Sequence, residues 1–276
     1  MKTIAIVCGG DSSEHDVSMR SAEGIASFID SERYLIYKVE ICAGKWEAML
    51  PDGSRAMVCK DDFSFVVEGE RIRPDMCYIT IHGAPGENGE LQGYFDLIGM
   101  PYSTCGVLVE ALTYDKFVLN NYMRAFGVSV ADSLLVKIGH DKEVSDEDIV
   151  SRIGLPCFVK PSRGGSSFGT TKVKTVEALR PAIELALEEG EDVMVESFMG
   201  GTEITCGCYK TKQKSVVFPI TEVVPQNEFF DYDAKYNGQV SEITPARISD
   251  KLAERVSKLT SMIYDLLGCH GIIRID

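Results

Sequence analysis

The chain has 276 residues, with 28 Lys and Arg against 42 Asp and Glu, so its net charge at pH 7 is −14. Nucleic acids and anionic membranes are bound by basic surfaces, and this charge therefore argues against both as partners. The nine cysteines are odd in number and contain no C-x-x-C pair, which argues against a disulfide framework and a zinc knuckle and fits a reducing cytoplasm. No apolar run approaches the roughly 20 residues of a membrane span, and the first residues do not form a signal peptide.

The first hundred residues alternate between strand and helix patterns. Residues 2–8 form a continuous apolar run, which is typical of a buried parallel strand. Further strands are expected at 34–42 and 76–82, and helices at 16–29 and 91–98. This alternation predicts an open α/β domain.

The pattern changes after Pro101, where one long helix is predicted over 106–126. Three successive strand patterns at 192–198, 203–209 and 215–224 predict a meander. Before this meander, strands are expected at 133–136, 157–160 and 168–173, and helices at 145–153 and 176–189. Pro181 is expected to kink or shift the start of the helix at 176–189.

The region 225–246 is polar and lacks periodicity, and a loop of this length is usually functional or disordered. Ser249 is expected to cap a helix that ends at Gly268. A final strand is predicted over 271–276.

The segment Phe158–Gly169, FVKPSRGGSSFG, places a lysine at the end of an apolar strand, next to a loop of glycine and serine. Backbone N–H groups of Ser166 and Ser167 would fold over phosphate oxygens, and Lys160 would add a point charge. The chain has neither a Walker-type loop nor a G-x-G-x-x-G motif. An ordinary flexible hairpin has the same composition, and the segment alone does not decide between the two interpretations.

A second candidate site begins with Gly9–Ser18, which follows the first strand and opens a helix. Ligands of open α/β sheets bind in that position, and the positive helix end favours a carboxylate. Glu14 would hold an ammonium group, so the two together suit a zwitterionic amino acid. His82, in another glycine-rich loop, fits a carboxylate-binding role. Taken alone, Glu14 is also explained by the helix dipole, and His82 as an ordinary surface or core histidine.

The connector ESFMGGTE begins at Glu196 and ends at Glu203. The connector backbone, which starts at Glu196, would read an adenine edge, and Glu203 would bind a ribose diol. In the later loop, Lys235 and Tyr236 would close over a phosphate and a second substrate. The structural alternatives are solvated glutamates and an exposed polar loop.

The last strand carries Arg274 and Asp276 two residues apart, so both side chains face one side. An arginine that stabilises an oxyanion beside a carboxylate that holds Mg²⁺ would be a coherent pair. A salt-bridged edge strand explains the same pattern.

Six segments, in this order, resemble the D-alanine–D-alanine ligases of the ATP-grasp superfamily: GGxSxExxVS, HGxxGExGxLQG, PYSTCGVLVEALTYDK, VKPSRGGSSFG, DYDAKY and GIIRID. The resemblance runs from Lys2 to Asp276. It implies an N-terminal Rossmann-like α/β domain over 1–104 and two α+β subdomains, 105–190 and 191–276, which enclose ATP. The implied activity is the ATP-dependent ligation of two D-alanines through an acyl phosphate, for peptidoglycan precursors, by a cytoplasmic enzyme that uses two Mg²⁺ or Mn²⁺ ions. A homodimer is also implied.

The resemblance assigns roles to individual residues. Glu14 would bind the ammonium of the first D-alanine, His82 would lie near its carboxylate, and Arg274 would stabilise the oxyanion. Glu14, Ser166 and Tyr236 would form a hydrogen-bonded triad. ATP binding falls to Lys116, Lys160, Ser166, Ser167, Glu196, Phe198, Met199, Glu203 and Lys235, and metal binding to Asp276.

The sequence also departs from the family pattern. Ser197 stands where the family often has lysine, so stacking on adenine is expected to be weaker. Family members continue beyond R-I-D with further metal ligands, so this 276-residue form is expected to bind metal poorly and to turn over slowly. Tyr236 favours D-alanine as acceptor. The rival interpretations are a D-alanine–D-lactate or other ATP-grasp carboxylate–amine ligase, and a catalytically silent nucleotide-binding form.

Overall fold

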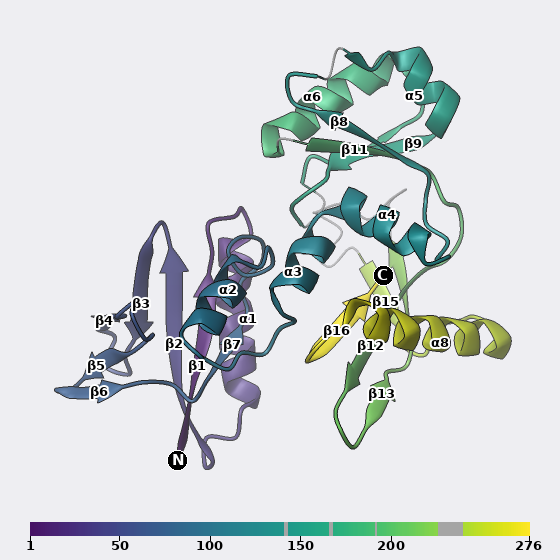
Figure 1. Cartoon of the computed structure of the whole chain (residues 1–276). Helices are drawn as coiled ribbons and strands as arrows, with labels where there is room; N and C mark the ends of the chain where they lie inside the picture. The colour runs from purple at the N-terminus through teal and green to yellow at the C-terminus, as the bar shows by residue number, and fades with distance from the viewer. Residues whose placement is uncertain (141–142, 166–167, 191, 226–239) are drawn as a thin grey trace. The chain divides into compact units, whose positions relative to one another are not determined.

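The computed structural model describes residues 1–276 apart from 141–142, 166–167, 191 and 226–239 (Figure 1). The described chain forms two compact units. The division into 1–104, 105–190 and 191–276 stays a prediction. The first unit consists of Met1–Ala111, Tyr209–Lys214 and Tyr264–Ile273, and the second of Leu112–Cys208, Ser215–Ile263 and Arg274–Asp276.

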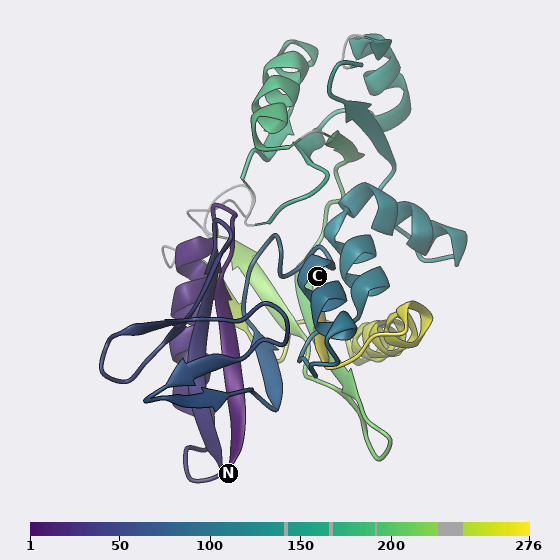
Figure 2. The same cartoon turned by 60° about the vertical axis from the view of Figure 1, so that its left-hand side comes forward.

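The first unit is built around β1 (Lys2–Gly9), which pairs in parallel with β2 (Tyr34–Cys42) on one side and β7 (Met76–Ile79) on the other. The predicted buried strand is confirmed, since its apolar residues from Ala5 to Cys8 are fully buried. Helix α1 (His15–Phe28) covers one face of this sheet in both views (Figure 1, Figure 2). The open α/β domain predicted from the alternation is therefore confirmed.

The sheet also has an antiparallel edge that the sequence analysis did not predict. Strands β3 (Lys45–Met49) and β4 (Arg55–Met57) extend it to the order β4-β3-β2-β1-β7. A separate pair, β5 (Phe65–Val67) and β6 (Glu70–Ile72), follows. The face opposite α1 is closed by α2 (Glu90–Leu97) and an aromatic cluster, whose members include Trp46, Phe63, Tyr94 and Phe95.

The single long helix predicted over 106–126 is wrong. Two helices, α3 (Val107–Tyr114) and α4 (Lys116–Ala125), meet at Asp115. The backbone of Asp115 is extended, and its carboxylate accepts the N–H of Val118 at 3.1 Å as an N-cap. A capping aspartate starts a new helix because it satisfies an N–H group that has no partner within the helix.

The second unit contains an antiparallel sheet of β8 (Ser133–Lys137), β9 (Cys157–Pro161), β10 (Thr171–Val173) and β11 (Asp192–Ser197), in the order β10-β9-β11-β8. Its alternate residues pack on a hydrophobic core with two helices. The other face, called the polar face below, carries Lys160, Lys172 and Glu196 beside Phe158 and the buried Met194. The predicted shift at Pro181 is confirmed, because a 3₁₀ turn precedes the α-helix. The helices of this core are α5 (Asp146–Ile153) and α6 (Leu179–Glu189), with the 3₁₀ turn η2 at Val176–Ala178.

The third sheet corrects two further predictions. Strand β11 belongs to the previous sheet, so the three successive strands do not form one meander. The segment 215–224 holds two strands, because Phe218–Ile220 separate them. The sheet order is β13-β12-β14-β15, with β16 on β12, and the strands are β12 (Glu203–Lys210), β13 (Ser215–Val217), β14 (Thr221–Pro225), β15 (Val240–Ile243) and β16 (Ile272–Ile275).

Helix α8 (Asp250–Leu267) begins and ends as predicted. Ser249 caps it by accepting the N–H of Leu252 at 3.3 Å, and Gly268 follows with φ of +70°. Glycine favours that left-handed conformation, which commonly ends helices. Strand β15 lies within the predicted loop 225–246, most of which falls outside the described residues.

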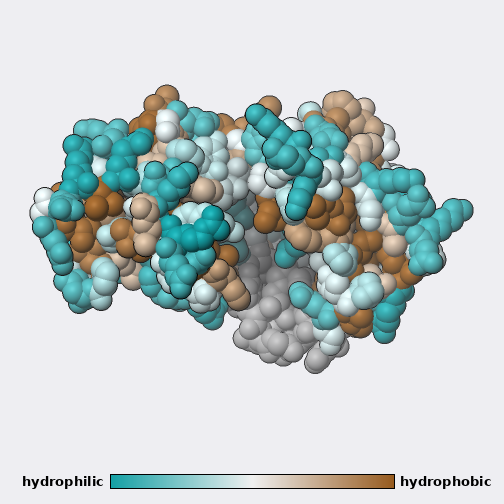
Figure 3. All heavy atoms as spheres, turned by 90° about the horizontal axis from the view of Figure 1, so that it is seen from below, coloured by the Kyte–Doolittle hydropathy of each residue, from teal (hydrophilic) through white to brown (hydrophobic). Residues whose placement is uncertain are grey.

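In the part of the chain that the structure describes, none of the helices combines the length and apolar character that crossing a membrane requires. On the face shown in Figure 3, hydrophobic side chains are interspersed with hydrophilic ones.

Candidate active site

The polar face of the β8–β11 sheet carries two of the predicted ATP-binding residues. Lys160 on β9 forms an ion pair with Glu196 on β11, and their side chains are only 21% and 14% exposed. The strand register places Glu196 opposite Phe158, and Phe158 opposite Lys172 of β10. A half-buried cation on the polar face is suited to bind an anion, because its ion pair already holds the side chain in place.

Lys116 approaches the glycine-rich loop from α4. Its ammonium donates to the carbonyls of Gly164 at 2.6 Å and Pro161 at 3.3 Å, and its backbone N–H donates to Ser162 at 2.8 Å. The loop that follows Lys160 is therefore in contact with a second predicted phosphate lysine. Phosphate oxygens would compete with these carbonyls for the N–H groups of the Lys116 ammonium, so the arrangement suits a phosphate site.

Asp115 holds the same loop in place. Its carboxylate accepts from the hydroxyl of Ser162 at 2.7 Å and from Nε of Arg163 at 3.1 Å. Burial favours the neutral acid, but the hydrogen bonds from Ser162, Val118 and Arg163 outweigh it and lower the pKa of Asp115. Asp115 is thus an ionised anchor between α4 and the loop, which the sequence analysis missed.

The connector after β11 lies against the same face. The ring of Phe198 lies 6.1 Å from that of Phe158, while Met199 is 68% exposed. Glu203 is an exposed residue at the start of β12, paired in register with Val223. The aromatic ring of Phe198 and the exposed thioether of Met199 form a surface on which a flat base can stack.

The two glycine-rich loops of the first unit meet. The hydroxyl of Ser12 donates to the carbonyl of His82 at 2.7 Å and accepts the N–H of Glu14 at 3.2 Å. The ring of His82 lies 3.4 Å from the hydroxyl of Ser21 on α1. Glu14 is only 5% exposed and stands at the N-cap position of α1, without a side-chain capping bond to the helix. Through Ser12, the structure therefore joins the two loops that carry the candidate amino-acid-binding residues Glu14 and His82.

Close backbone packing holds these loops. A Cβ on Gly10 would lie 2.7 Å from Cγ2 of Ile81, and one on Gly86 would lie 2.5 Å from Cβ of Ile81. Gly10 also has φ of +98°. Asp11 donates its N–H to the carbonyl of Ala84 at 3.1 Å, which joins the two loops directly. Side chains larger than hydrogen are therefore excluded here.

Both domain models of one family match this chain. The family described as D-ala D-ala ligase N-terminus matches residues 3–105, and its C-terminus counterpart matches 122–276. The D-alanine–D-alanine ligase of Bacteroides fragilis strain YCH46 is 64% identical over 275 residues, covering 100% of this chain and 84% of the relative. The chain belongs to the D-alanine–D-alanine ligase family.

Solved structures of the family agree with the fold. The VanG D-Ala:D-Ser ligase of Enterococcus faecalis is 31% identical, with a TM-score of 0.84 over 99% of this chain and 84% of that one. The D-alanine–D-alanine ligase of Bacillus anthracis complexed with ATP is 25% identical, with a TM-score of 0.75 over 100% of this chain and 81% of that one. The expected ATP-grasp architecture is confirmed, and the family uses ATP.

The last strand places Arg274 and Asp276 on one side, as predicted, since Nε of Arg274 lies 3.2 Å from Oδ1 of Asp276. Both side chains are largely exposed, so the salt-bridge alternative describes their present state. In the ranges that the structure describes, no group of three or more His, Cys, Asp and Glu is placed to hold a metal ion. The roles of both residues remain predictions.

Four other candidate residues, Ser166, Ser167, Lys235 and Tyr236, lie outside the described residues. The triad of Glu14 with Ser166 and Tyr236 therefore also stays a prediction.

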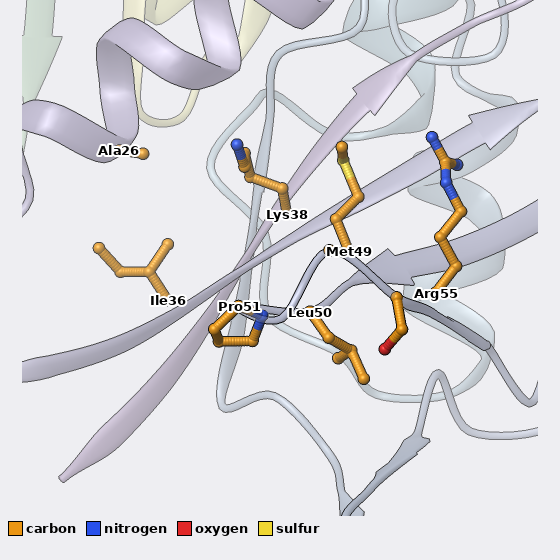
Figure 4. A pocket seen from close by; sticks show the side chains of 9 residues that line it. Ala26, Ile36, Lys38, Met49, Leu50, Pro51 and Arg55 are labelled. Atoms are coloured by element: carbon orange, nitrogen blue, oxygen red, sulfur yellow. The ribbon is translucent and has the colours of Figure 1, made fainter.

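A surface pocket of about 400 Å³ lies elsewhere in the first unit, between β2 and the β3–β4 turn (Figure 4). Its cations already have partners, since Lys38 pairs with Glu23, and Arg55 pairs with Glu40 and Glu47. The pocket contains none of the candidate residues of this ligase family, so we do not assign it to the active site.

Proposed function

We propose that this chain joins two molecules of D-alanine at the expense of ATP, forming the dipeptide used in peptidoglycan precursors. The observation that carries the proposal is the match of both family domains along the chain. Two local features support it: the lysines around the glycine-rich loop suit a triphosphate, and the buried Glu14, on a loop that Ser12 joins to that of His82, suits a small zwitterion.

The chemistry explains why both features are needed. A carboxylate is a poor electrophile, because its leaving group would be oxide or hydroxide. Transfer of the γ-phosphoryl group of ATP to the first D-alanine gives an acyl phosphate, from which the second D-alanine's amine displaces phosphate. Lys116 and Lys160 would neutralise charge on the phosphates, and Arg274 would stabilise the tetrahedral oxyanion.

A divalent ion is expected for this reaction, and Asp276 is the ligand we propose for it. The described residues do not complete such a site around Asp276, which is 64% exposed and paired with Arg274. We therefore assign no step of the reaction to the metal.

Glu14→Gln tests the amino-acid site. We expect the variant to lose ADP release that depends on D-alanine, because a neutral amide no longer attracts the substrate ammonium. Affinity for Mg·ADP, measured by calorimetry, should stay within about twofold of the unchanged protein, since Glu14 belongs to the amino-acid site. Equal D-alanine-dependent turnover in the two proteins would show that the amino-acid site is elsewhere.

A second acceptor is the main rival, because one similar structure is a D-Ala:D-Ser ligase. Each assay therefore includes D-serine and D-lactate as competing acceptors with D-alanine as donor. We expect the D-alanyl-D-alanine product to dominate. A preference for D-serine or D-lactate would reassign the acceptor while leaving the ATP site unchanged.

A further inference from the structure

Lys172 on β10 is a cation whose role the active-site assignment leaves unexplained. Its ammonium lies 4.1 Å from the ring centroid of Phe198, and the side chain is half-buried. Within the described ranges, Lys172 has no carboxylate at ion-pair distance. A cation held by an aromatic face keeps its N–H groups available to a further acceptor, because the ring accepts no conventional hydrogen bond.

The strand register places Lys172 on the polar face of the sheet. Lys172 lies opposite Phe158, and Phe158 lies opposite Glu196. The neighbouring residues Val159 and Val173 are fully buried in the opposite, hydrophobic face. Because side chains alternate along strands, Lys172 shares its face with Glu196 and therefore with the Lys160–Glu196 ion pair.

The same register separates Lys172 from the phosphate end of the site. Lys160 is the second residue after Phe158 and leads into the glycine-rich loop, so the row of Lys172 lies about 7 Å back along the strand. The ring of Phe198, in the connector, contacts both Phe158 and Lys172, which lie opposite each other on the two strands. Lys172 is thus placed at the connector end, where the base of a nucleotide is expected.

We propose that Lys172 binds the purine base of the nucleotide. Its ammonium, positioned by the face of Phe198, donates a hydrogen bond to a ring nitrogen of the base. Adenine offers such nitrogens as acceptors at its edge, and a charge-assisted hydrogen bond to a half-buried donor is stronger than a neutral one. This assignment rests on the proposed ATP site and adds a base-binding residue to it.

Calorimetry with a non-hydrolysable ATP analogue and with inorganic tripolyphosphate, each with Mg²⁺, tests the proposal on the full chain. Lys172→Met keeps the length and apolar stem of the side chain but removes the donor. We expect the variant to bind the ATP analogue about tenfold more weakly, in line with the loss of one charge-assisted hydrogen bond. Its affinity for tripolyphosphate, which has no base, should be unchanged.

Two further variants complete the experiment. Lys172→Arg keeps a donor over Phe198 and should retain most of the affinity for the ATP analogue. Lys137→Met removes an exposed lysine from β8, at the far edge of the same sheet, and should change neither ligand's affinity. Thermal unfolding of each variant checks that the fold is kept.

The outcomes separate the inference from the function on which it rests. Equal weakening of both ligands by Lys172→Met would place Lys172 on the phosphates and overturn the base assignment. Unchanged affinity for the ATP analogue would overturn the inference entirely. If the unsubstituted protein binds neither ligand, the proposed nucleotide site itself is wrong.

Discussion

The glycine loops of the first unit and the polar face of the β8–β11 sheet achieve ligand binding in different ways. In the loops, the backbone of Gly10 and Gly86 packs so closely on Ile81 that neither position has room for a Cβ atom. On the polar face, the sheet backbone is regular, and the function is carried by half-buried side chains such as Lys160 and Glu196.

This difference predicts how each region responds to change. Substitutions in the loops should alter the fold first and binding as a consequence, since overpacking displaces backbone. Substitutions on the polar face should alter binding first, because these side chains protrude from a sheet whose core lies on its other face. Lys160 there is already paired with Glu196, and an anionic ligand would compete with that carboxylate.

Gly86→Ala should give the largest effect. The added methyl would lie 2.5 Å from Cβ and 2.7 Å from the carbonyl oxygen of Ile81. No rotamer relieves this contact, because a Cβ position is set by the backbone. We expect the free energy of unfolding to fall by about 3 kcal/mol, measured by urea denaturation, since overpacking a dense core typically costs that much.

Gly24→Ala is the matched control. Gly24 lies exposed in the middle of α1, with nothing within 4 Å of an added Cβ. This substitution should stabilise the protein by up to about 1 kcal/mol, because alanine is the better helix former. A Gly86→Ala variant as stable as the unchanged protein would show that the loops can move apart, and the contrast between the regions would fail.

Lys160→Met should come next, and on binding rather than on the fold. It removes an ammonium from the proposed phosphate site but keeps a chain of similar length on β9. We expect affinity for Mg·ADP to fall about 30-fold, which corresponds to about 2 kcal/mol for one charge-assisted contact. Calorimetry provides the measurement. A large loss of thermal stability with unchanged affinity would mean that Lys160 serves only its ion pair with Glu196.

Much of the first unit could be predicted from its sequence, because local pattern and final burial agree there. Residues 5–8 are apolar since this part of β1 is buried on both faces, and the strand over 34–42 has the predicted bounds. Strands β3 to β6 were missed because they are short and largely exposed on one side, so their residues show no clear alternation.

The break between α3 and α4 could not be predicted from local spacing. Leu112 and Phe117 fit one continuous helix, and the Asp115 side chain that caps α4 is also held by Ser162, 47 residues away. Likewise, the sequence predicted Lys160 and Glu196 as separate ligands, but it carried no information on the strand register that pairs them. Lys172 was missed for the same reason, since its row on the sheet depends on β9.

The smallest of these effects concerns Glu110 on α3 of the first unit, where burial disfavours the ionised form of the carboxyl group. Burial, with the charges of Cys105 and Glu87 nearby, raises the pKa of Glu110 from 4.5 to about 8. The native protein therefore keeps a proton that the unfolded chain releases above pH 4.5, so stability falls as pH rises from 4.5 toward 8. Polar-face acids such as Glu196 are instead paired with cations.

Glu110→Gln should remove this penalty. A neutral amide of the same shape has no proton to lose, so the variant should gain about 1 kcal/mol over the unchanged protein at pH 8 and almost nothing at pH 4.5. Urea denaturation at both pH values measures the gain, and Glu32→Gln, at an exposed position of the same unit, is the control. A gain that is equal at the two pH values would mean that Glu110 is ionised in the fold, and that the first unit tolerates buried charge as readily as the polar face does.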